Sequence, residues 1–241
     1  MSKAYRLLQQ RPFLAREIVR RVLQRASEVQ QYWALREVSF EVEKGTSVGL
    51  IGANGSGKST LLSLIARTSY PTGGDLEVRG RVGPLLELGA GFHPDLTGFE
   101  NVLLNASLLG LSREETFSRL DSILDYSGID EFIHSPIQTY SVGMRARLGF
   151  AVIAHIDPDI LLVDEVLSVG DAGFQAKCAT TMRQFKDDGK TMLLVSHDMA
   201  TIQDMCEQAI WLEEGEIRAR GSSDEVVASY LESLETRTRR E

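Results

Sequence analysis

The sequence has 241 residues, of which 43% are hydrophobic and 25% are charged, a composition typical of one large globular domain or two smaller lobes. It contains no run of eighteen consecutive apolar residues and does not begin with the apolar core of a secretory signal, so the chain is predicted to stay in the cytoplasm. The net charge of −8 disfavours nucleic acid as a partner, because binding to a phosphate backbone needs clustered positive charge.

An excess of positive charge marks the start of the chain. Residues 1–31 carry seven basic residues against two acidic ones, although the chain as a whole is acidic. Within this segment Leu14, Ile18 and Val22 recur every four residues, which predicts an amphipathic helix in a basic N-terminal arm over 1–33. Two interpretations are open: the helix packs on its own domain with a solvated arginine face, or it contacts an anionic membrane surface or a partner.

Strand patterns and a glycine-rich loop follow the arm. The stretch "LREVSFEVEKG" (35–45) alternates apolar and polar residues, as an outer antiparallel strand does. The next stretch, "SVGLIGANGSGKSTLLSLIA", matches the Walker A pattern between a buried strand and a helix. Its glycines let backbone amides surround phosphate oxygens, Lys58 reaches the β- and γ-phosphates of ATP, and Ser59 offers its hydroxyl to Mg²⁺. The residues expected to contact the nucleotide are Gly52, Asn54, Gly55, Gly57, Lys58, Ser59 and Thr60.

Polar residues end two later strand patterns. The apolar run 160–163 is suited to a central parallel strand, and Asp164 and Glu165 follow it directly. Open α/β sheets bind ligands at the carboxyl ends of their strands, so Asp164 is expected to hold Mg²⁺ and Glu165 to act as the general base towards water. The stretch "TMLLVSHD" ends similarly, and its His197 is expected to contact the γ-phosphate rather than to be a buried structural histidine.

A second anion-binding helix start lies in the stretch "YSVGMRARLGFA" (140–151). Ser141 is suited to cap a helix, and Gly143 permits close approach, so free amide groups would point outward at the positive end of the helix dipole. The preceding segment has glycine turns and then helical periodicity, which predicts a small helical lobe over about 88–155 inserted into the sheet domain.

Taken together, these motifs resemble, in order and spacing, the ATPase subunits of ABC transporters. The resemblance implies a P-loop α/β fold with a mainly parallel sheet, an antiparallel β edge subdomain and the inserted helical lobe. It places the ATPase domain over 34–220 and a C-terminal tail over 221–241. It also implies that Ser141 and Gly143 contact ATP held by a second copy in a head-to-tail dimer, that Asp171 of "SVGD" borders the nucleotide, and that Glu87 contacts the metal.

The stretches "ALREVSFEVEKG", "LLELGAGFHPDLTGFEN" and "VDEVLSVGD" are similar to those of bacterial polysaccharide exporters, which move O-antigen, capsule or teichoic acid chains. This closer resemblance implies a separate transmembrane permease, a lipid-linked glycan as cargo and a place on the cytoplasmic face of the membrane. Tyr5 matches the adenine-stacking residue of the group, and Trp33 is the alternative. The chain departs from the group at Val142, where a smaller or hydroxyl-bearing residue is usual, and at Glu87, where glutamine is usual.

Other functional classes remain as alternatives. A soluble ABC-type ATPase acting on DNA or ribosomes would be expected to carry a very long coiled-coil insertion or a second ATPase domain, whereas only 54 positions separate Glu87 from Ser141. A kinase or GTPase would leave the Ser141 helix start and His197 unexplained. A nucleotide-binding module without hydrolysis would leave Glu165 without a role. An ABC ATPase for a different transported substrate also stays open.

Overall fold

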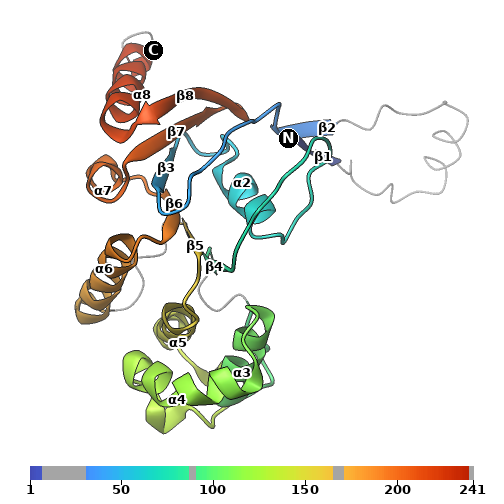
Figure 1. Cartoon of the computed structure of the whole chain (residues 1–241), viewed down its shortest axis with the longest axis vertical. Coiled ribbons are helices and arrows are strands. Elements are labelled where there is room, and N and C mark those ends of the chain that lie inside the picture. Colours follow the sequence, from blue (N-terminus) through green and yellow to red (C-terminus); the bar gives the residue numbers. More distant parts are fainter. Residues whose placement is uncertain (7–30, 87–90, 165–170, 239–241) are drawn as a thin grey trace, which may run out of the picture.

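The computed structural model describes residues 1–6, 31–86, 91–164 and 171–238. Its centre is a six-stranded sheet in which five strands run parallel and the last edge strand is antiparallel (Figure 1). In spatial order the strands are β4 (Val82–Leu85), β5 (Ile160–Asp164), β6 (Thr191–Val195), β3 (Ser47–Ile51), β7 (Gln208–Glu213) and β8 (Glu216–Ser222). The parallel sheet with an antiparallel edge confirms the predicted fold class.

The interior strands are continuous apolar runs because both of their faces are covered. Every residue of β3 and β6 is buried, as the sequence predicts for central parallel strands. Strand β4 was not predicted, and it contains Pro84. Proline has no N–H to donate to a neighbouring strand, and β4 tolerates it because this strand lies at the edge of the sheet, with β5 as its one partner.

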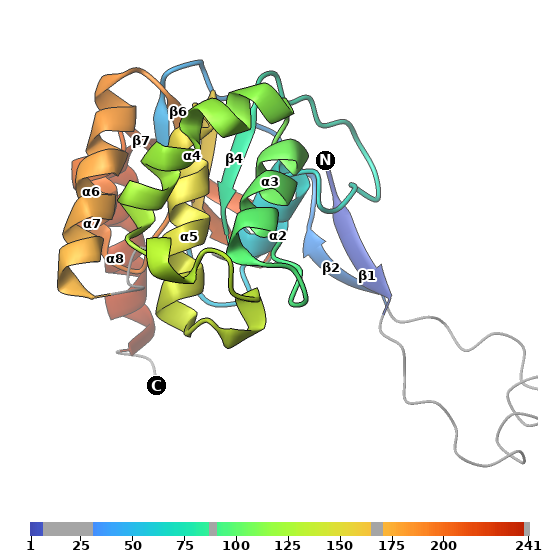
Figure 2. The same cartoon turned by 90° about the horizontal axis from the view of Figure 1, so that it is seen from below.

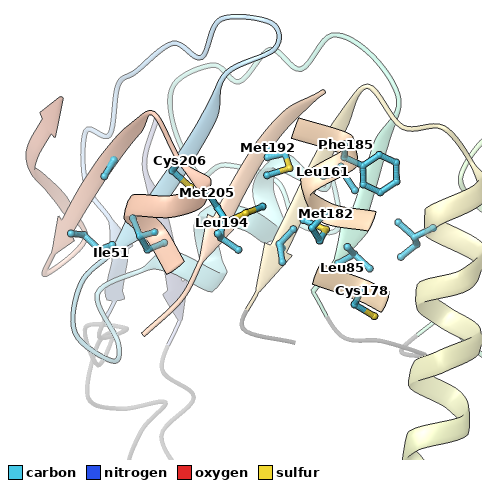
Figure 3. Close-up of a cluster of buried hydrophobic side chains, with 14 of the residues drawn as sticks. Ile51, Leu85, Leu161, Cys178, Met182, Phe185, Met192, Leu194, Met205 and Cys206 are labelled. Atoms are coloured by element: carbon cyan, nitrogen blue, oxygen red, sulfur yellow. The ribbon is translucent and has the colours of Figure 1, made fainter. Parts of the chain in front are cut away.

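Helices cover both faces of the sheet. On one face α2 (Lys58–Ile65) packs Leu61, Leu62, Leu64 and Ile65 against alternate residues of the strands. The opposite face is covered by α6 (Ala172–Asp187), α7 (Met199–Met205) and α8 (Ser223–Thr238). Figure 3 shows side chains of this second layer, where residues of α6 meet those of β5 and β6.

Helix α8 occupies most of the segment that the sequence assigned to a C-terminal tail. Val226 and Val227 are buried in the same apolar cluster as α6 and α7. The ring of Tyr230 packs edge-on against Trp211 of β7, with 5.5 Å between the ring centroids. Val226, Val227 and Tyr230 thus pack this part of the predicted tail against the sheet, while the domain boundary at residue 221 stays a prediction.

A separate group of helices forms the inserted lobe, at the bottom of Figure 1. It consists of α3 (Gly98–Leu108), α4 (Arg113–Ser127), the short 3-10 turns η1 (Asp130–Phe132) and η2 (Ile137–Thr139), and α5 (Val142–His155). Reciprocal caps start two of its helices: Thr97 and Glu100 bond each other's backbone at α3, and Ser112 and Glu115 do so at α4. The lobe has its own apolar core, to which Val102, Ile123 and Leu148 contribute.

The chain begins with a strand that pairs with a distant one. β1 (Lys3–Arg6) runs antiparallel to β2 (Gln31–Leu35), and Tyr5 lies opposite Tyr32. Both ends of the predicted N-terminal arm are thus β-strands. The amphipathic helix predicted within it falls in 7–30, outside the described residues, and stays a prediction.

The outer strand predicted over 35–45 is wrong, because β2 ends at Leu35 and residues 36–46 contain no strand. Glu37 takes a left-handed backbone conformation with φ 47°, which interrupts extended pairing. The N–H of Val38 donates instead to the carbonyl of Met1 at 2.9 Å. Within the described ranges no helix combines the length and the apolar character needed to cross a membrane.

Candidate nucleotide-binding site

The Walker A loop joins β3 to α2 and requires glycine at two positions. Gly52 has φ 144°, and a Cβ there would lie 2.1 Å from the carbonyl oxygen of Leu212. Gly57 has φ 107°, and its Cβ would lie 2.6 Å from the carbonyl oxygen of Ala34. Side chains are excluded at both positions, so the backbone turns tightly between β7 and β2. The turn places the first backbone N–H groups of α2 at the loop. Such groups at the start of a helix bind anions.

Lys58, the first residue of α2, is buried within the Walker A loop. Its ammonium group donates to the carbonyl oxygens of Gly52 at 2.7 Å and Ala53 at 3.0 Å. Carbonyl oxygens are neutral partners, whereas phosphate oxygens are charged and accept stronger hydrogen bonds from an ammonium group. A phosphate group in the loop therefore has a cation directly available to it.

Two predicted metal ligands meet although they lie on different elements. The Ser59 hydroxyl, in the first turn of α2, donates to a carboxylate oxygen of Asp164, at the end of β5, over 3.3 Å. A hydroxyl oxygen and a carboxylate are ligands that Mg²⁺ accepts. Within the described part of the chain no three His, Cys, Asp or Glu side chains cluster as a metal site. Mg²⁺ is usually held by one or two carboxylates together with substrate phosphates.

A pocket of about 360 Å³ opens beside the Walker A loop. It brings together nine of the residues predicted from sequence: Tyr5, Asn54, Gly55, Gly57, Lys58, Ser59, Thr60, Asp164 and His197. His197 follows β6, which lies between the strands that carry Asp164 and the Walker A loop. Asp164, His197 and the Walker A loop thus lie at the same edge of the parallel sheet, where open α/β sheets bind their ligands.

The β1–β2 hairpin forms the aromatic end of this pocket. Tyr5 lines it, as predicted, but the alternative aromatic residue, Trp33, does not. Tyr32 lines it instead, and the sequence prediction missed this residue. Successive residues of a strand point to opposite faces, so Tyr32 and Trp33 cannot both face the loop. The strand register, with Tyr32 opposite Tyr5, brings it to the pocket, and this pairing has no local signal in the sequence.

The comparisons with known proteins agree with this geometry. A family model described as "ABC transporter" matches residues 35–168, more than half of the chain. The chain belongs to the ABC transporter family. The solved ATP-binding subunit of an ABC transporter has the same fold, with a TM-score of 0.72, 26% identity and coverage of 82% of this chain and 87% of that one. A dimeric ATP-binding cassette solved with ADP and Pi has a TM-score of 0.69 at 24% identity, covering 92% and 96%.

Two relatives carry names that describe export of cell-surface polymers. The O-antigen export system ATP-binding protein RfbB of Klebsiella pneumoniae is 49% identical over 204 residues, which are 85% of this chain and 83% of the relative. The teichoic acids export ATP-binding protein TagH of Lactococcus lactis is 46% identical over 199 residues, which are 83% of this chain and 42% of that protein. The polysaccharide exporter group recognised from the sequence motifs is thus confirmed.

The second predicted anion-binding helix start, at Ser141, lies away from the pocket of its own chain. Ser141 caps α5 by accepting a hydrogen bond from the N–H of Met144 at 3.1 Å, as predicted. Neither Ser141 nor Gly143 lines the pocket, and Figure 1 shows α5 in the helical lobe, apart from α2. Val142 between them is 69% exposed. The start of α5 therefore lies at the surface of the chain and outside this pocket.

Asp171, predicted to border the nucleotide, caps α6 instead of lining the pocket. Its carboxylate accepts a hydrogen bond from the N–H of Phe174 at 2.9 Å and lies 3.6 Å from the guanidinium of Arg147 on α5. The Phe174 N–H and, more weakly, Arg147 hold the pKa of this carboxyl below its usual value. In this arrangement Asp171 connects α6 to the helical lobe, and its contact with nucleotide stays a prediction.

Two predicted site residues, one catalytic and one metal-contacting, lie outside the described residues. They are Glu165, the expected general base, and Glu87, the expected metal contact. Glu165 directly follows β5, which ends at Asp164. Glu87 comes shortly after β4, which ends at Leu85. Their side-chain roles stay predictions.

Proposed function

We propose that the chain is the ATP-hydrolysing subunit of an ABC transporter that exports a lipid-linked polysaccharide through a separate membrane permease. The observation that carries the proposal is the pocket in which Lys58, Ser59, Asp164 and His197 meet. The cargo rests on the relatives, which are named for export of O-antigen and teichoic acids. The subunit accordingly works on the cytoplasmic face of the membrane, beneath its permease.

Nucleotide binding follows from the Walker A geometry. The Lys58 ammonium exchanges its carbonyl partners for phosphate oxygens of ATP, while the backbone amides at the start of α2 donate to the same phosphates. The adenine base of ATP reaches the aromatic end of the pocket, where Tyr5 is placed to stack on it. Ser59 and Asp164 are the residues that would hold Mg²⁺, which when bound neutralises charge on the phosphate oxygens.

Hydrolysis needs a water molecule oriented towards the terminal phosphate. Glu165 follows Asp164 in the chain, and as general base it accepts a proton from that water. His197 lines the same pocket just after the end of the neighbouring strand, β6, and donates a hydrogen bond to the terminal phosphate. Glu87, which follows β4 in the sequence, would contact the metal.

A second copy of the chain completes the site. The outward position of Ser141 and Gly143 lets the start of α5 in one subunit face the nucleotide of the other. Closure of this head-to-tail dimer over two ATP molecules drives the permease, and hydrolysis reopens the dimer. Each nucleotide then has donors from two subunits, so binding and dimer closure are linked.

Export can be tested with a pair of lysine variants in the native host. Lys58→Ala removes the cation of the Walker A loop, whereas Lys44→Ala removes an exposed lysine outside the pocket and serves as the control. We expect the Lys58 variant to reach the membrane with its permease but to leave the polysaccharide inside the cell, while the Lys44 variant exports normally. Normal export by the Lys58 variant contradicts the transport role, and loss of a different exported molecule contradicts the cargo.

A further inference from the structure

The β1–β2 hairpin presents two tyrosines, not one, to the nucleotide pocket. Tyr5 and Tyr32 are directly opposite each other in the antiparallel register, which places their side chains on the same face of the hairpin. Both line the pocket, and their residues are 42% and 49% exposed. Two partly exposed aromatic rings next to a phosphate loop form a surface suited to a flat aromatic ligand.

The surroundings of the two rings differ. The Lys3 ammonium lies 5.2 Å from the centre of the Tyr5 ring and donates to the carbonyl of Tyr70 at 2.7 Å, so a tethered cation covers part of Tyr5. Tyr32 instead makes a hydrogen bond from its hydroxyl to the carbonyl of Gly55 in the Walker A loop, at 3.4 Å.

Strand β2 is the part of the hairpin that contacts the Walker A loop. The Ala34 carbonyl lies so close to Gly57 that a Cβ on Gly57 would be 2.6 Å away, and the Tyr32 hydroxyl reaches the carbonyl of Gly55, two residues earlier in the same loop. In both views of the fold α2 lies beside β2 (Figures 1 and 2). The Tyr32 ring is therefore held at a fixed place relative to the groups that bind phosphate.

We infer that Tyr32 is a second base-binding residue, which contacts the nucleobase together with Tyr5 and ties the hairpin to the Walker A loop through its hydroxyl. The inference rests on the proposed function, since it assigns a residue to the base of the nucleotide that the pocket binds. Trp33, on the opposite face of β2, has no part in it.

The test compares a ligand that has a base with one that lacks it. Affinities of the purified chain for Mg-ATP and for Mg-tripolyphosphate are measured by calorimetry for the wild type and for Tyr32→Ala, Tyr32→Leu and Tyr32→Phe. Trp33→Ala is the matched control, because it removes a neighbouring aromatic ring outside the pocket. Tyr32→Leu keeps apolar bulk in β2, so a loss shared with Tyr32→Ala is assigned to the aromatic ring.

Base stacking on an aromatic side chain is typically worth enough to change affinity several-fold to about a hundred-fold. We expect Tyr32→Ala and Tyr32→Leu to weaken ATP binding about ten-fold and to leave tripolyphosphate binding unchanged, while Tyr32→Phe stays within about three-fold of wild type. Equal losses for both ligands, or Tyr32→Ala binding ATP as tightly as Trp33→Ala, would overturn the inference. A wild-type chain that binds neither ligand would overturn the proposed function itself.

Discussion

Ser59 and Asp164 are 105 positions apart in the chain, yet the Ser59 hydroxyl donates to the Asp164 carboxylate over 3.3 Å. The contact joins the start of α2, which follows β3 in the chain, to the end of β5, although β6 lies between β3 and β5 in the sheet. It places two oxygen ligands of the kind that Mg²⁺ prefers next to the loop that binds phosphate.

Ser59→Ala should lower Mg²⁺-dependent ATP hydrolysis at least ten-fold, because a metal ion that stabilises phosphoryl oxygens contributes several kcal/mol to the transition state. Ser63→Ala is the control: this serine lies one turn further along α2, and its hydroxyl donates to the Ser59 carbonyl at 2.8 Å. The measurement is the turnover rate over a range of Mg²⁺ concentrations. Equal rates and equal Mg²⁺ dependence for the two variants would remove Ser59 from the metal site.

Glu165→Gln should keep ATP binding but lose most hydrolysis. A positioned general base contributes about 10²–10⁴-fold to a rate, and glutamine is similar in size but cannot accept the proton. With hydrolysis blocked, the ATP-bound dimer should accumulate and elute earlier than the monomer in gel filtration. An unchanged turnover rate would show that another group serves as the base.

Ser141→Arg tests whether α5 acts on the other subunit. The substitution should leave ATP binding to the monomer nearly intact, because Ser141 does not line the pocket of its own chain, and should abolish ATP-dependent dimerisation. Mixing this variant with Lys58→Ala should restore at most one competent site in each mixed dimer. The readout is ATPase activity of the mixture against each variant alone, and full activity of Ser141→Arg by itself would contradict the two-subunit site.

Asp171→Ala should destabilise the fold more at neutral than at acid pH. The pKa of Asp171 is lowered in the folded chain, so its charged form contributes stability above the ordinary carboxyl pKa of about 4, and this contribution is lost as the pH falls through the lower folded pKa. The difference in urea midpoint between wild type and variant should therefore narrow from pH 7 to pH 3. An equal difference at pH 7 and pH 3 would contradict this role for the Asp171 carboxylate.

Asn101→Ala should cost about 2–4 kcal/mol of unfolding free energy, because it leaves buried polar groups without partners. The Asn101 amide is fully buried, accepts from the N–H of His93 at 2.7 Å and donates to the carbonyls of His93, Leu96 and Thr97. Asn105→Ala, one turn further along α3, removes fewer bonds at a partly exposed site and should cost clearly less. Urea unfolding measures both, and equal losses would contradict the expectation.

The parts of the site that the sequence predicted are those with local signals. The Walker A spacing implied β3, the loop and α2 together, and the apolar run before Asp164 implied a strand end at the ligand edge. The Ser141 cap was also predictable, because a capping residue acts on amides within its own turn.

Features that depend on pairing between distant segments were missed. The β1–β2 hairpin joins residues on either side of a 24-residue segment, and its register, not its composition, brings Tyr32 rather than Trp33 to the pocket. Strand β4 has only four residues, one of them proline, so its pattern is too short to distinguish from a turn. The ion pair between Asp171 and Arg147 was missed for the same reason, because it joins α6 to α5.

The apolar layer beneath α6 and α7 contains both cysteines of the chain, Cys178 and Cys206. Figure 3 shows them among the side chains of this layer. Burial raises the pKa of each thiol to about 12, and since only the thiolate reacts readily with alkylating reagents, both are protected in the closed fold. Alkylation of either thiol thus requires α6 or α7 to separate from the sheet, so the chain carries its own chemical probe for opening of this layer.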